Sequence, residues 1–140
     1  MTHAIRFTSS DSLAGVVFMC LDSMAARRQI MEHAIETSRW VDCVIETRMD
    51  AEGGISHCFD PHNKIQNECW WLNWYSDEEA EHIGGCSEPQ SIISAIWGTS
   101  MLAMKQFEQF ARVGDTYEMS NMVYMDFPSF KIETQHWPSA

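Results

Sequence analysis

Residues 15–47 read GVVFMCLDSMAARRQIMEHAIETSRWVDCVIET, and they predict three consecutive elements of secondary structure. The apolar run 15–21 stops at polar residues, a pattern that is typical of a strand buried on both faces in a parallel sheet. Residues 24–37 repeat apolar side chains at helical spacing, and residues 40–47 form a second apolar strand. A strand, a helix and a strand within about 30 residues predict a βαβ unit with two parallel strands.

Turn residues predict that a third strand comes directly after this unit. The segment from Asp50 to Gly54 is a turn signal, and residues 55–59 alternate like a strand that leaves the turn. Residues 60–85 predict a long crossover with little regular structure or with a short helix, because polar and aromatic residues alternate there without a period.

Capping residues and one proline predict the remaining elements. A helix is expected over residues 87–113, from a Ser-Glu-Pro-Gln capping box to a stop at Gly114, and its small central side chains let it approach a sheet closely. Residues 122–127 and 130–135 alternate around Pro128 and predict an antiparallel hairpin or edge strands. The expected fold is therefore α/β: a partial Rossmann-like parallel sheet with packed helices and a C-terminal antiparallel hairpin.

Length and composition limit the classes of protein to consider. The 140 residues fit a single domain, with a lead at 1–14, a main region at 15–113 and C-terminal strands at 114–140. The net charge of −11 argues against nucleic-acid or membrane partners, since both require clustered Lys and Arg. The chain shows neither a membrane-spanning run nor a signal-peptide core, and its five cysteines include no close pair, so we expect reduced thiols in the cytoplasm.

The turn after the first strand carries the candidate chemistry. Ligands of doubly wound sheets bind beyond the carboxyl ends of the strands, which is where Asp22 is expected. One carboxylate there can hold Mg²⁺ against phosphates, and Arg27, one helical turn later, can offer a fork of donors to a carboxylate or phosphate. The alternative is that Asp22 or Ser23 only caps the helix and that Arg27 is solvated.

Three segments, in order, carry a resemblance to a known family: the strand that leads into Asp22-Ser23-x-x-x-Arg27, Glu46-Thr47-Arg48-Met49 followed by Gly54-Ile55, and Cys86-Ser87-Glu88 followed by the helix that ends Met104-Lys105-Gln106-Phe107. They resemble segments of the ThiF/MoeB/HesA family, the bacterial relatives of ubiquitin-activating enzymes. The resemblance covers residues 15–113, about two thirds of the chain. The family's Gly-rich phosphate loop has no counterpart, no Lys precedes Lys64, Ser23 replaces the family's Asn, and Cys-x-x-Cys zinc motifs are absent.

The resemblance implies that the chain matches the second half of an ATP-dependent adenylating domain. In that chemistry ATP activates the C-terminal carboxylate of a ubiquitin-like or sulfur-carrier protein as an acyl-adenylate. Asp22 would hold Mg²⁺, Arg27 and Ser23 would contact the cofactor Mg-ATP or the incoming carboxylate, and Cys86 would accept the acyl group. A homo-oligomer, or a complex with a chain that supplies the Gly-rich half, is the implied assembly.

Other interpretations stay open. A non-catalytic interaction module derived from the same fold is the main alternative to an enzyme. We expect no zinc site, because the available ligands fit no recognised spacing; these are His57, Cys58, His62, Cys69, His82 and Cys86. The aromatic cluster at residues 70–75 is either a cover for the domain's own core or an anchor for another chain.

Overall fold

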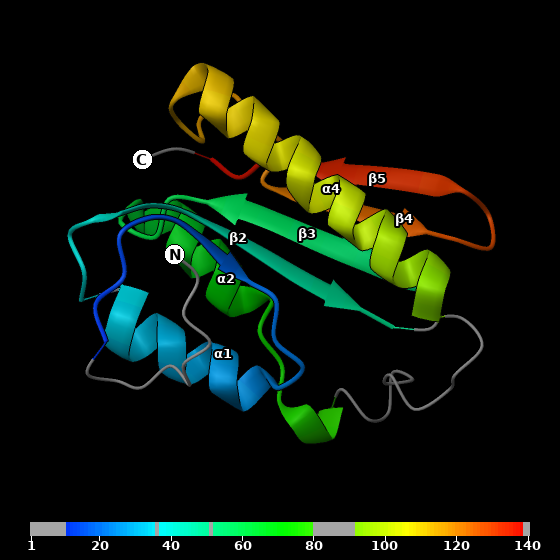
Figure 1. The fold of residues 1–140 in the computed structure, drawn as a ribbon, viewed down its shortest axis with the longest axis horizontal. Helices are drawn as coiled ribbons and strands as arrows, with labels where there is room; N and C mark the ends of the chain where they lie inside the picture. Colours follow the sequence, from blue (N-terminus) through cyan, green and yellow to red (C-terminus); the bar gives the residue numbers. More distant parts are fainter. Residues whose placement is uncertain (1–10, 36, 51, 80–91, 139–140) are drawn as a thin grey trace, which may run out of the picture.

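The computed structural model describes residues 11–35, 37–50, 52–79 and 92–138. Its five-stranded mixed sheet has the order β1-β2-β3-β4-β5, the same as the order along the chain. The strands are β1 Gly15–Met19, β2 Val41–Met49, β3 Gly53–Phe59, β4 Met122–Asp126 and β5 Lys131–Gln135. Figure 1 shows the long helix α4 (Ile92–Val113) along one face of this sheet, with α1 (Met24–Ile30) and α2 (Lys64–Leu72) on the other side.

The predicted βαβ unit is confirmed. Strands β1 and β2 pair in parallel from Val16 opposite Cys43 to Met19 opposite Glu46. The connecting helix α1 continues as one turn of π-helix, Met31–Ile35. Ser23 is the N-cap, and its Oγ accepts a hydrogen bond from the amide of Ala26, so the capping role belongs to Ser23.

The predicted parallel sheet is limited to this one pair, because the other three pairings are antiparallel. For β2 and β3, the reason is the short connection between them. Asp50 accepts hydrogen bonds from the amides of Glu52 and Gly53 and so closes a tight turn, and a tight turn can join only antiparallel neighbours. The fold is thus mixed α/β. The C-terminal hairpin of β4 and β5 is confirmed, with Pro128 in its turn.

In the described part of the crossover after β3, helix α2 is capped by Asn63, and residues 77–79 are also helical. The predicted long helix is observed from Ile92 and ends where expected: Gly114 adopts a φ of +83° and its amide bonds to the carbonyl of Phe110. The predicted start at Ser87 lies outside the described residues.

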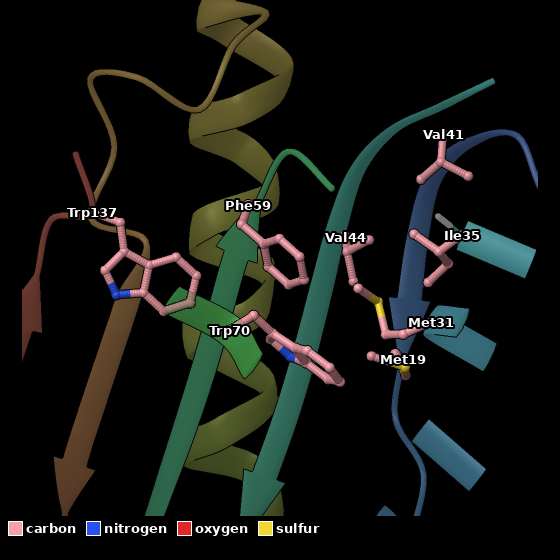
Figure 2. Close-up of a cluster of buried hydrophobic side chains, with 8 residues drawn as sticks. All are labelled: Met19, Met31, Ile35, Val41, Val44, Phe59, Trp70 and Trp137. Carbon is pink, nitrogen blue, oxygen red and sulfur yellow. The ribbon is translucent and has the colours of Figure 1, made fainter. Parts of the chain in front are cut away.

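Two apolar cores lie on the two faces of the sheet. Figure 2 shows the core beside α1 and α2, which consists of Met19, Met31, Ile35, Val41, Val44, Phe59, Trp70 and Trp137. The core under α4 includes Ile45, Cys58 and Ala103. The small residues of α4 let it lie close to the sheet as predicted, since a Cβ on Gly54 of β3 would stand 1.9 Å from the Oγ1 of Thr99.

Candidate functional site

The candidate site lies where the parallel strands β1 and β2 both end. Strand β1 ends at Met19, and Asp22 follows three positions later with an exposed side chain. Because the carboxyl ends of parallel strands meet at one edge of a sheet, Asp22 stands at the carboxyl end of the parallel pair of β1 and β2. The structure thus places Asp22 where the sequence predicted it.

Asp77 occupies the start of α1 beside Asp22. Its carboxylate accepts hydrogen bonds from the Oγ of Ser23 at 3.0 Å, from the amide of Ala25 at 3.2 Å and from the amide of Met24. These donors, the Met24 amide above all, hold the pKa of Asp77 below its ordinary value. Any other anion that binds Ser23 and these amides must first displace Asp77. The sequence did not reveal this contact, since residues 23 and 77 are 54 positions apart.

Arg27 is buried rather than solvated, so that alternative for this side chain is wrong. Its Nη1 donates to Oε1 of Glu46 at 2.8 Å and to the carbonyl of Met19 at 3.3 Å, and its Nη2 donates to the carbonyl of Leu21. The sequence predicted that Arg27 offers its donors to a bound carboxylate or phosphate, but in the structure its carboxylate partner is Glu46 of the chain itself. Its two carbonyl bonds fix the segment that leads to Asp22.

Glu46 is the centre of a fully buried polar network. Its Oε1 accepts from Arg27 and from Nε of Arg48, both at 2.8 Å, while its Oε2 accepts from Nδ1 of His57 at 2.8 Å and from Nε1 of Trp70 at 3.0 Å. Burial alone raises the pKa of Glu46, but the hydrogen bond from His57 and the charge of Arg48 outweigh burial and hold this pKa well below its ordinary value. The carboxylate stays ionised.

His57 and Arg48 complete the network. Burial lowers the pKa of His57, only partly opposed by Glu46, so the ring is neutral at pH 7 and donates through Nδ1. Nη1 of Arg48 donates a hydrogen bond to the carbonyl of Asn73. The guanidinium carbon of Arg48 also lies over two aromatic rings, 5.7 Å from the ring centroid of Trp70 and 5.3 Å from that of Tyr75. The network joins α1, β2, β3 and α2, and it reaches β1 through the carbonyl of Met19.

The aromatic cluster at residues 70–75 covers the chain's own core. Trp70 is fully buried and stacks against Phe59, Trp71 packs against the same cluster, and Trp74 donates to the carbonyl of Met24. Of the two interpretations left open by the sequence, the structure thus favours the first for these rings.

The remaining predicted ligands are dispersed or not described. Cys86 and His82 lie outside the described residues. Cys58 faces Cys43 on the neighbouring strand, with 3.3 Å between the two Sγ atoms, whereas His62 is exposed. Within the part of the chain that the structure describes, no three His, Cys, Asp or Glu side chains are close enough together to hold a metal ion.

An apolar pocket opens on the α4 side of the same sheet edge. It has a volume of about 400 Å³ and lies between the ends of β1 and β2 and the first half of α4. Its lining consists of Phe18, Cys20, Thr47, Met49, Ile96, Thr99, Ser100, Ala103 and Met104. No sequence pattern indicated this pocket, because it forms only when α4 packs across the sheet.

Comparisons with known proteins leave the family open. No protein-family model matches the chain, and no curated protein matches it. Among the helices that the structure describes, none combines the length and the apolar content that crossing a membrane requires.

Proposed function

We propose that this chain is the half of a ThiF/MoeB/HesA-type activating unit that comes after the nucleotide loop, and that it acts with a second polypeptide that supplies the Gly-rich loop. In the proposed reaction, a C-terminal carboxylate of a ubiquitin-like or sulfur-carrier protein attacks the α-phosphate of ATP, and pyrophosphate leaves. The observation that carries the proposal is the exposed Asp22 at the carboxyl end of a parallel strand pair. The free thiols Cys43 and Cys58 fit a reducing cytoplasm as its setting.

The proposed roles derive from the chemistry of each side chain. Mg²⁺ commonly takes one or two carboxylates and completes its shell with phosphate oxygens and water, so the single carboxylate of Asp22 suits an ion that arrives with ATP. Arg27 is a positioning residue, since its bonds to the Met19 and Leu21 carbonyls fix the segment before Asp22. Ser23 becomes a ligand only when Asp77 leaves it. The thiolate of Cys86 would attack the acyl carbon, form a thioester and release AMP.

A second candidate function is a non-catalytic interaction module. The observation that favours it is the exposed apolar face of α4, where Trp97 is 70% and Met101 68% exposed. Such a module would bind a partner but would not support exchange between pyrophosphate and ATP.

The decisive assay is ATP–pyrophosphate exchange by the chain mixed with the carrier protein and with any polypeptide of the same genome that carries a strand–G-x-G-x-x-G–helix unit. We expect Asp22→Asn to reduce exchange at least about 100-fold, because the metal-binding carboxylate is lost. Asp42→Asn is the matched control, since Asp42 is also an exposed carboxylate and lies at the opposite end of the same parallel pair.

Two outcomes would count against the proposal. Normal exchange by Asp22→Asn would refute the role of this carboxylate. Complete absence of exchange from a mixture that nevertheless forms a complex would favour the interaction module.

A further inference from the structure

Strand β1 is an edge strand with the composition of an internal one. Among the residues that the structure describes, its only hydrogen-bonded neighbour is β2. Edge strands usually carry charges or proline that prevent further pairing, but residues 15–19, GVVFM, contain neither. Parallel strands are normally covered on both sides, whereas Phe18 is 43% exposed. The free edge of β1 is therefore suited to pair with another strand.

The outer face of α4 is apolar along its first three turns. Its inner positions, Ala95, Thr99 and Ala103, are buried against the sheet, yet the opposite positions are apolar too. These exposed side chains are Ile93, Ile96, Trp97, Met101 and Met104. With Phe18 and Met49 at the strand ends, they present on the order of 800 Å², which is what one partner contributes to a standard interface. We call these seven residues the α4–β1 surface.

The usual distances between packed helices and between paired strands leave room for a further helix beside α4. Helices pack about 8–10 Å apart and strands about 4.8 Å apart, so one helix covers two strands. Helix α4 packs mainly on β3 and β2, and it reaches the same face of β1 through Phe107, whose ring centroid lies 5.4 Å from that of Phe18. Among the described helices, none lies centrally over this face of β1. The next helix position would lie over β1 and over a further strand beside it. The apolar pocket is at that position, with Phe18 and Ile96 in its lining.

A second copy of the chain fits this surface poorly. A two-fold axis at the edge of β1 would pair the two β1 strands but would leave the two α4 helices about 20 Å apart, roughly twice the distance at which helices pack. Self-association would also bring together two chains that each carry a net charge of −11. A different chain that carries both a strand and a helix fills the same space and can balance the charge.

We propose that the α4–β1 surface binds a second, less acidic polypeptide, which adds a strand along β1 and a helix beside α4. This inference rests on the proposed function, because it identifies where the polypeptide with the Gly-rich loop docks. It does not require that the complex be active.

The test measures binding of the strand–G-x-G-x-x-G–helix half encoded by the same genome, by light scattering after gel filtration and by titration calorimetry. We expect a 1:1 complex in which alkylation of Cys20, an exposed thiol in the pocket lining, slows at least about 10-fold. Trp97→Glu and Met104→Lys should each weaken binding at least about 30-fold, since Met104 lines the pocket beside β1. Leu72→Glu is the control, because Leu72 is 84% exposed but lies on α2, behind the sheet.

The outcomes separate this inference from the proposed function. A complex that resists both variants, or no complex with any such half, overturns the docking surface. A homodimer of the chain alone that Trp97→Glu dissociates overturns it too, since the occupant is then a second copy. A 1:1 complex that these variants disrupt but that exchanges no pyrophosphate supports the docking surface and contradicts the proposed function.

Discussion

The two faces of the sheet differ in what they bury. On the α1 and α2 side, the closed face, the ionised carboxylate of Glu46 is enclosed with two guanidinium groups, and every oxygen of the carboxylate has two donors. On the α4 side, the open face, Trp97 and Met101 point outward. The closed face thus buries charges, whereas the open face exposes the apolar side chains that the proposed docking surface would use. Substitutions on the closed face should therefore cost far more stability than substitutions on the open one.

Removal of the central charge should produce the largest loss of stability. Glu46→Gln leaves Arg27 and Arg48 buried without a counter-charge, which we expect to lower the free energy of unfolding by about 3–5 kcal/mol. The measurement is urea unfolding followed by Trp fluorescence. Glu32→Gln is the matched control, because the Glu32–Arg28 pair is exposed and should contribute less than about 0.5 kcal/mol. A loss below about 1 kcal/mol for Glu46→Gln would show that the network does not stabilise the closed face.

Acid should destabilise the closed face of the sheet. Burial holds the pKa of His57 below its ordinary value of 6.5, so the unfolded chain binds a proton first as the pH falls. The free energy of unfolding should therefore decrease below pH 6.5, by up to about 1.4 kcal/mol per pH unit until the folded-state pKa is reached. Glu46 adds a second loss below about pH 4.5, since its pKa in the folded chain is also lowered.

The measurement of this acid effect is urea unfolding at about pH 7.0 and about pH 5.5, on either side of the ordinary histidine pKa. His57→Gln should reduce the difference between the free energies of unfolding at the two pH values. His62→Gln changes an exposed histidine and should leave this difference unchanged. An unchanged pH dependence in His57→Gln would assign the acid sensitivity to another group.

The open face should give the smallest effect on stability. Trp97→Glu changes an exposed side chain of the isolated chain, so the free energy of unfolding should shift by less than about 0.5 kcal/mol. Ala103→Glu, on the buried side of the same helix, should cost several times more, because it places a charge against the sheet. A loss above about 1 kcal/mol in Trp97→Glu would mean that the chain itself covers this surface.

Much of the local structure could be predicted from residues that are close in sequence. The βαβ unit of residues 15–47, the turn at Asp50, the end of α4 at Gly114 and the hairpin around Pro128 all depend on short patterns of apolar, capping and turn residues. The same patterns placed Asp22 at the end of β1. They predicted more parallel strands than the sheet contains. The apolar pattern of a strand is the same whether the next strand returns antiparallel through a tight turn or follows in parallel.

Only the tertiary structure decided which charges pair and which surfaces stay open. Glu46 meets Arg27 and His57 from other elements, and Asp77 reaches Ser23 across 54 positions of sequence. The sequence determined the elements because backbone preference and periodicity act over a few neighbouring residues. The network, the occupied start of α1 and the exposed face of α4 depend on how those elements pack, since packing sets the distance between residues that are far apart in the chain.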